Sequence, residues 1–206
     1  MYALVVNNSI TRVFPGPKGF EHNGNQYSPD IFYKWSKAEK EAIGLYEVTT
    51  DSTNYKDTKW YINTNESFAF ANNTVTRSWG TATAKAHADT LWTQQDSDDG
   101  DLPSDKEVGD VKIEGLKTQL IRTIKQQAAG ILQDTDWYIV RKADAGTAVP
   151  SSITTHRAAV RIKAAEMETA ITNASDTPAL ETLYTYTEDD DGNVTRPLGE
   201  LPTLED

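Results

Sequence analysis

The chain has no cysteine, only three histidines and no long hydrophobic run. Without cysteine it can form no disulfide, thiolate metal site or cysteine nucleophile, so the fold rests on packing. The histidines, His22, His87 and His156, lie in none of the sequence patterns that mark zinc sites or catalytic triads. No segment approaches the roughly 18 apolar residues of a membrane span, and the first residues lack the basic leader of a secretion signal. We therefore expect a soluble protein that is made in a cytoplasm and does not enter a membrane.

Basic residues are also in the minority. The chain holds 31 Asp and Glu against 20 Lys and Arg, which gives a formal net charge of -11. Because this charge repels a phosphate backbone, nucleic acid is not an expected partner. Solubility alone explains such a charge, and a basic partner surface stays open as the alternative. Only 37% of the residues are hydrophobic, so the core is modest or completed by a partner.

Residues 1–93 are expected to form a β-rich domain with one short helix. Tyr2–Val6 and Thr11–Phe14 are rich in strand-forming residues, and the intervening Asn7 and Asn8 favour a hairpin turn. The segment Ser36–Glu39 has the pattern of a capping box, which predicts a helix that ends near Gly44.

Further strands are predicted in the rest of this domain, at Leu45–Thr49, Lys59–Ile62, Glu66–Ala71 and Thr74–Trp79, with a turn at Asn72 and Asn73. Five aromatic residues fall here: Trp60, Tyr61, Phe68, Phe70 and Trp79. We expect them to form cross-strand pairs in a small antiparallel sheet. The alternative is an exposed platform on which a glycan stacks.

The C-terminal half changes character. Residues 94–110 are strongly acidic, and we interpret them as a linker. Apolar residues then recur every three or four positions, which predicts a helix over 111–132: Ile113, Leu116, Leu120, Ile124, Ala128 and Ile131. A second helix is expected over 152–173, after Pro150, so that residues 111–173 form a helical hairpin. Its apolar face would hold Ile153, Val160, Ala164, Met167 and Ile171. Residues 174–206 are expected to be an extended acidic tail with one small β-hairpin. The predicted fold class is therefore α+β.

No set of residues predicts chemistry. The acidic turns Asp96–Asp101 and Asp189–Asn193 lack the ligand spacing of a calcium loop, so we interpret them as solvated turns. A catalytic base also needs a nucleophile and an orienting group nearby, and no such set is evident. We predict no catalytic residue, no metal site and no cofactor, and thus a protein that is not an enzyme.

The junction between the two predicted helices carries a recognisable pattern. The chain reads Ile131-Leu132-Gln133-Asp134-Thr135-Asp136-Trp137, then Val149-Pro150, then Thr155-His156-Arg157-Ala158-Ala159-Val160-Arg161. This pattern resembles the C-terminal part of bacteriophage tail-fibre assembly and related tail proteins, over residues 115–165. His156 stands where that family usually has tyrosine, and the loop over 138–149 is longer and carries Arg141 and Lys142.

The resemblance implies a structural protein of the virion, at the tail, baseplate or tail-fibre attachment, made in the host cytoplasm. Its partners would be other phage tail, baseplate or fibre proteins, and assembly as a homo-oligomer stays open. One alternative is an assembly chaperone that helps the tail fibre fold and is not retained in the particle. Another, of a different class, is a glycan-binding or hydrolytic fibre domain, which would need paired carboxylates beside exposed aromatics.

Three residues of the junction are the candidate partner-binding site: Trp137, Arg157 and Arg161. Arg157 and Arg161 are four residues apart, which places them on one face of a helix. Tryptophan and arginine dominate the energetics of protein interfaces, so these side chains could anchor a partner chain. The alternative is architectural, because residues at helix junctions commonly serve packing.

Overall fold

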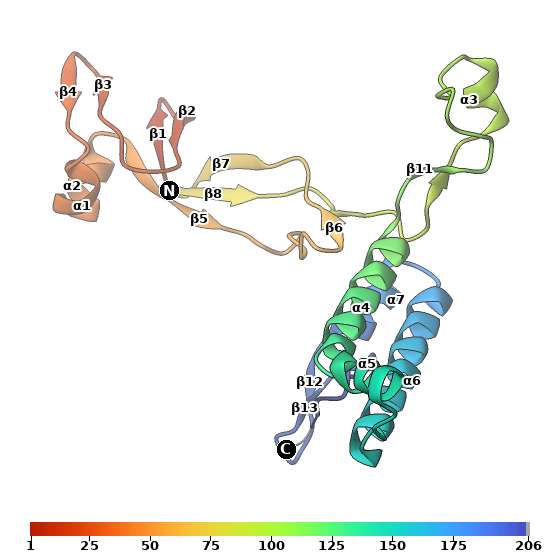
Figure 1. Ribbon diagram of the computed structural model, residues 1–206. Helices are drawn as coiled ribbons and strands as arrows, with labels where there is room; N and C mark the ends of the chain where they lie inside the picture. Colours follow the sequence, from red (N-terminus) through yellow and green to blue (C-terminus); the bar gives the residue numbers. More distant parts are fainter. Residues whose placement is uncertain (205–206) are drawn as a thin grey trace. The chain divides into compact units, whose positions relative to one another are not determined.

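The computed structural model describes residues 1–204 and divides the chain into two compact units. The first unit is Met1–Thr83 and the second begins at Ala84. The first is rich in strands and the second holds the long helices, in agreement with the predicted α+β class (Figure 1). The boundary falls before the expected one at residue 93, so the acidic residues 94–110 lie within the second unit. Their role as a linker stays a prediction.

The first unit opens with the predicted hairpin. Strands β1 (Tyr2–Val6) and β2 (Ser9–Phe14) pair antiparallel. Asn7 and Asn8 both have positive φ, at 50° and 60°. Asparagine tolerates this left-handed conformation, which matches the twist of a tight β-hairpin. The hairpin and its turn are thus confirmed.

The sheet of the first unit is mixed, not purely antiparallel as predicted. Its order is β2-β1-β5-β8-β7, with β5 at Leu45–Thr50, β7 at Ser67–Ala71 and β8 at Thr74–Ser78. Strands β5 and β8 pair parallel, whereas β7 and β8 form the predicted hairpin around Asn72 and Asn73. The segment between β5 and β7 starts and ends at the same end of the sheet, so β7 runs back against β5 and β8 then runs in the same direction as β5. The alternation of apolar and polar residues does not show whether two neighbouring strands run parallel or antiparallel.

Each face of this sheet carries an apolar cluster. On one face Leu4, Phe14 and Leu45 pack with residues of the segments around it: β3 (Phe20–His22), β4 (Asn25–Tyr27), α1 (Ile31–Lys34) and α2 (Lys37–Ala42). On the other face Ala3, Val5 and Val75 form a second cluster with Phe68 and Phe70. The predicted capping box of α2 is present, with Ser36 and Glu39 bonded reciprocally. The short strand β6 is Tyr61–Ile62, and β9 is Thr83–Ala84.

The second unit begins with a two-stranded ribbon of β10 (Thr90–Leu91) and β11 (Val111–Ile113), with helix α3 (Gln94–Asp98) between them. Helix α4 (Leu116–Gln133) therefore starts five residues later than predicted. The expectation that Ile113 belongs to its apolar stripe is wrong, because Ile113 lies in β11 and is 62% exposed. Gly115 is the N-cap, and the Asp89 carboxylate accepts from the Gly115 amide (2.7 Å) and the Thr118 hydroxyl (2.8 Å).

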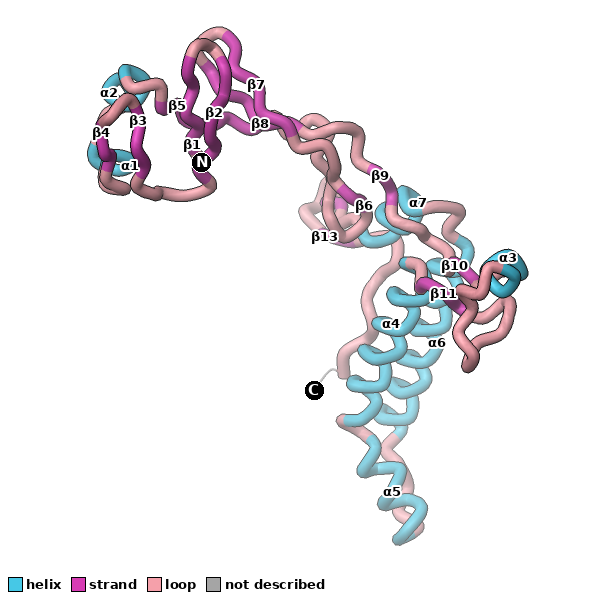
Figure 2. Tube along the Cα trace, turned by 90° about the horizontal axis from the view of Figure 1, so that it is seen from above, coloured by secondary structure: helices cyan, strands magenta, loops and turns pink. Residues whose placement is uncertain are grey.

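The predicted helical hairpin is present. Helices α4 and α6 (Ser151–Asn173) lie side by side (Figure 2). Most residues predicted for their stripes are buried: Leu116, Leu120, Ile124, Ala128, Ile153, Val160, Ala164, Met167 and Ile171. Ile131, also predicted, is half-buried. Helix α5 (Asp136–Ala145) occupies most of the segment expected as a loop. In the described chain, no helix combines the length and apolarity that crossing a membrane requires.

The C-terminal segment is more structured than an extended tail. Helix α7 (Thr177–Tyr184) starts at an Asp176 cap, and its Leu180 is fully buried. The predicted small hairpin exists in shifted form as β12 (Thr187–Glu188) and β13 (Val194–Thr195). Two residues of the sequence indicate the start of α7: Asp176 is a favoured N-cap residue, and Pro178 suits the first turn of a helix.

Candidate partner-binding site

The candidate site lies where α4 ends, α5 begins and α6 passes alongside. Arg157 is on the buried side of α6, Arg161 is one turn further along the same helix, and Trp137 is in the first turn of α5. The structure therefore places all three residues in the helical unit, but gives each a different environment.

Arg157 fixes the corner between α4 and α5. It is only 7% exposed, and its Nη1 donates to the Leu132 carbonyl (2.6 Å) and the Thr135 hydroxyl (2.7 Å). Its Nη2 forms an ion pair with the Asp136 carboxylate at 2.8 Å. The last carbonyls of a helix have no partner within the helix, and hydrogen bonds from a charged donor are strong. Arg157 thus caps α4 and holds the first residue of α5 in place.

Arg161 does not join this network. It is exposed, and its Nη1 donates to the Arg157 carbonyl, at 3.4 Å. The two arginines are four residues apart on one helix, but Arg157 is buried and Arg161 is exposed. Arg161 is free to meet a partner, whereas Arg157 acts from inside the hairpin.

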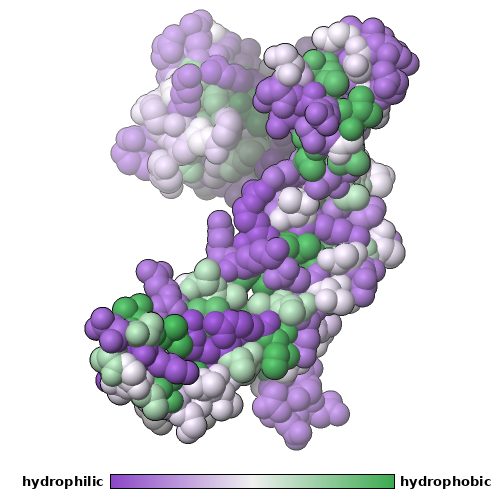
Figure 3. All heavy atoms as spheres, turned by 45° about the vertical axis from the view of Figure 1, so that its right-hand side comes forward, coloured by the Kyte–Doolittle hydropathy of each residue, from purple (hydrophilic) through white to green (hydrophobic). Residues whose placement is uncertain are grey.

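Trp137 belongs to an exposed apolar surface. Its side chain is 51% exposed, and Ile139 and Val140 on the same helix are also exposed, Val140 at 65%. No residue of α5 is buried. Trp137 and Val140 are three residues apart and share one side of the helix, whereas Ile139 lies on another side. We call Trp137 and Val140 the α5 patch. In Figure 3 hydrophobic atoms reach the surface at this end of the helical hairpin, at the lower left.

Aromatic and cationic contacts order the rings beside the patch. The Trp137 and Tyr138 ring centroids are 3.9 Å apart, and the Arg141 guanidinium lies 4.5 Å from the Trp137 centroid. A guanidinium over an indole face is a favourable contact that also restricts the ring. At its other end α5 stops at Gly146, whose φ of 67° allows its amide to donate to the Lys142 carbonyl. The patch is thus presented on a helix defined at both ends.

Sequence reasoning missed Val140 and Arg141 as part of this surface, because the segment was expected to be a loop. Two features of the sequence indicate helix α5. Asp136 lies in its first turn, where a carboxylate favours the helix dipole, and Gly146 is a typical residue just past a helix end.

The aromatics of the first unit do not form one exposed platform. Trp60 and Tyr61 are buried, while Phe68 and Phe70 pack into the second cluster of the sheet. Two of the five residues pair with aromatics outside this set, Phe70 with Tyr46 and Trp79 with Tyr55. The Arg77 guanidinium also lies 4.4 Å from the Trp79 centroid.

The three histidines are not brought together. His22 is in β3, His87 precedes β10, and His156 is buried in α6. Over residues 1–204, no group of three or more His, Asp or Glu side chains is arranged to hold a metal ion. In the acidic turn before β13, the Asp189 carboxylate accepts from the Asp191 and Asn193 amides, and its pKa is lowered chiefly by the Asn193 side chain.

Comparison with known proteins adds no relative. No family model matches the chain, and neither the curated proteins nor the solved structures contain a match.

Proposed function

We propose that this chain is a bacteriophage virion structural protein of the tail, baseplate or tail-fibre attachment, and that it acts by protein–protein binding and not as an enzyme. The resemblance of residues 115–165 supplies the phage context. The observation that carries the binding role is the α5 patch, since a tryptophan and a valine are exposed together on one side of a short helix. Exposed apolar patches of this kind mark interaction sites.

The buried Arg157 network supports the same proposal. A partner gains affinity when the surface that it binds is already ordered, because less conformational entropy is lost. Arg157 orders the start of α5, and Arg141 restricts the Trp137 ring. In this proposal Trp137 is the anchor, Arg161 is a contact residue at the rim, and Arg157 is a positioning residue.

The direct test is quantitative mass spectrometry of purified tailed particles produced from the genome that encodes the chain. The proposal predicts the chain at a fixed ratio to the major tail protein. Absence from particles, together with abundance in the infected-cell lysate, would identify an assembly chaperone instead.

The α5 patch is tested separately by Trp137→Ala, because the side chain is exposed and its removal should leave the fold intact. We expect incorporation into particles to fall about tenfold or more, as for a central interface residue. Tyr33→Ala is the matched control, since Tyr33 is an exposed aromatic of the first unit. If both variants were incorporated like the unmodified chain, the α5 patch would not be the anchor.

A further inference from the structure

The β10–β11 ribbon has an uncovered apolar face. Leu91 is directly opposite Val111 in the antiparallel register, so the two side chains lie on the same face. Ile113 is opposite Thr90, beyond a register shift that leaves Lys112 as an extra residue of β11, and Leu91, Val111 and Ile113 are all exposed. A two-stranded ribbon is marginal by itself, and a third strand or a packing surface would stabilise it. No such layer covers this face in the part of the chain that the structure describes.

Trp92 and Lys112 contact each other beside these exposed residues. The Lys112 ammonium lies 4.4 Å from the Trp92 ring centroid and forms an ion pair with the Asp96 carboxylate. Trp92 directly follows Leu91, and Lys112 is the extra residue at the register shift of β11, so the contact between them does not involve the exposed side chains of Leu91 and Val111. The ribbon thus has one open apolar face.

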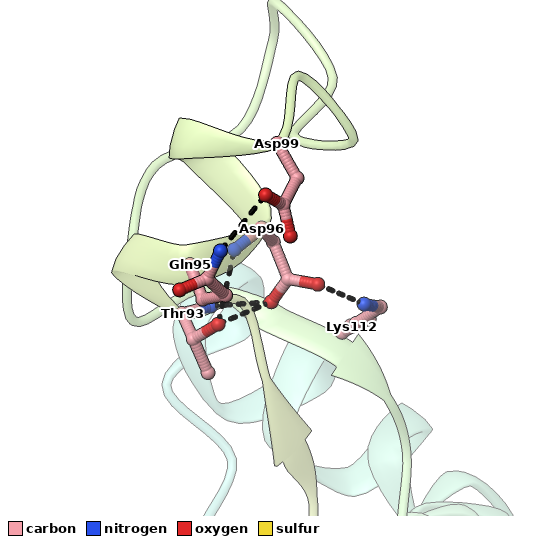
Figure 4. Close-up of polar contacts among 5 residues, drawn as sticks. All are labelled: Thr93, Gln95, Asp96, Asp99 and Lys112. Atoms are coloured by element: carbon pink, nitrogen blue, oxygen red, sulfur yellow. Dashed lines mark hydrogen bonds and ion pairs between the residues drawn. The ribbon is translucent and has the colours of Figure 1, made fainter.

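Residues 92–110, between the two strands, form a defined structure that we call the acidic arm. The Trp92 amide donates to the Asp110 carbonyl and the Gly109 amide donates to the Trp92 carbonyl, both at 2.8 Å. Asp96 accepts from the Thr93 amide and hydroxyl (2.8 and 2.6 Å) as well as from Lys112, as Figure 4 shows. These contacts, Lys112 first, lower the pKa of Asp96 to about 2. The arm therefore keeps a definite shape beside the open face.

Negative charge is concentrated in this part of the molecule. Residues 1–83 carry eight acidic and eight basic side chains, so the whole formal charge of -11 arises after residue 83. Residues 94–110 alone hold seven Asp or Glu and one Lys. Within the described chain only Asp96 of these seven is in an ion pair, and the other six are exposed. In Figure 3 the arm, at the upper right, shows hydrophobic atoms among strongly hydrophilic ones.

We propose that the β10–β11 ribbon and the acidic arm form a second docking surface, for a partner protein that presents an apolar strip bordered by lysine or arginine. The open face supplies apolar area, and the arm supplies charge complementarity, which favours basic partners and speeds their association. A second copy of this chain is not the occupant, because its own helical unit is equally acidic and would be repelled.

This surface is separate from the α5 patch. The ribbon precedes the first turn of α4 and α5 follows its last turn, and the 18 residues of α4 separate these ends by about 27 Å. One helix thus joins two docking surfaces of different chemistry, one mainly aromatic and apolar, the other apolar and acidic. Each surface can fail its test without affecting the other.

The probe is a fluorescent peptide in which valine and lysine alternate, added to the full chain and followed by fluorescence anisotropy. A matched peptide of alternating valine and glutamate is the control for the charge. We expect the lysine peptide to bind and its affinity to fall as salt is added, because the arm charges are exposed. The glutamate peptide should not bind.

Two sets of charge variants locate the site. The first removes three charges from the arm: Asp98→Asn, Asp101→Asn and Asp105→Asn. The second removes three charges from the β12–β13 hairpin: Glu188→Gln, Asp190→Asn and Asp191→Asn. Both have the same net charge, but only the first should weaken binding, by about tenfold for three exposed charge pairs. Equal weakening by both sets would mean that the total charge alone attracts the peptide, which overturns the proposal.

The apolar face is tested by Ile113→Lys, with Val194→Lys as its control, because both side chains are strongly exposed. The first should abolish binding of the lysine peptide and the second should leave it unchanged. The proposal is also overturned if the lysine peptide does not bind at low salt. Self-association of the chain that Ile113→Lys abolishes would likewise overturn it, since the occupant would then be a second copy.

Discussion

Replacing Arg157 with methionine should destabilise the helical unit substantially. Methionine has a similar length and no charge, so it fills the space but removes the charged donor to the Leu132 carbonyl and to the buried Thr135 hydroxyl. The Leu132 carbonyl keeps the weaker bonds from the Thr135 amide and hydroxyl. Each hydrogen bond from a charged donor contributes about 1.5 kcal/mol. The ion pair with the largely exposed Asp136 adds about 0.5 kcal/mol. The new apolar packing offsets a part of this, so we expect a net loss of about 2–3 kcal/mol.

The assay is urea unfolding of the full chain followed by far-UV circular dichroism, which reports mainly on the long helices. Arg161→Met is the matched control, because Arg161 is exposed on the same helix, and its effect should stay within about 0.5 kcal/mol. Thr135→Val should reproduce a part of the Arg157 effect, since it removes only the hydroxyl. If Arg157→Met unfolded at the same urea concentration as Arg161→Met, the corner between α4 and α5 would not depend on this network.

Two further variants and one titration test other parts of the structure. A Cβ on Gly115 would lie 2.3 Å from the Ala88 carbonyl carbon and oxygen, so Gly115→Ala should cost about 2 kcal/mol or more in urea unfolding. Gly130→Ala is the matched control within α4, because nothing lies within 4 Å of its Cβ, and it should stabilise by up to about 1 kcal/mol; a loss as large as that of Gly115→Ala would contradict this reasoning. The folded pKa of Asp96 is about 2, below the ordinary 3.8, so its contacts stabilise the arm fully above the ordinary value and are lost as pH falls through about 2. The indole NMR signal of Trp92 should shift over that window because Lys112 is released, and Asp96→Asn should remove the step; a signal that stays constant down to pH about 2 would disprove the coupling.

The local signals in the sequence predicted most of the elements. The Asn7-Asn8 and Asn72-Asn73 turns, the Ser36 capping box and the apolar stripe of α6 each depend on a few neighbouring residues. The recurrence of apolar residues every three or four positions also predicted which sides of α4 and α6 face each other. These features are local, so a single sequence carries them.

Features that depend on distant residues were not predictable in the same way. The start of α4 is set by Asp89, which bonds to the amide of Gly115 from another segment of the chain. The parallel pairing of β5 with β8 depends on the path of the intervening loop. Similarly, Trp137 could be proposed as a site residue from its type and position, but the burial of Arg157 follows only from the packing of α6 against the end of α4.

The most direct test of the central claim is photo-crosslinking from position 137 during particle assembly. The photoreactive phenylalanine analogue p-benzoyl-phenylalanine would replace Trp137, and in a matched chain Tyr33. After irradiation, the products in purified particles would be identified by mass spectrometry. The account predicts that position 137 crosslinks to one other tail, baseplate or fibre protein and that position 33 does not give this product. The account would be contradicted if position 137 gave no crosslink, or if it gave the same crosslinks as position 33.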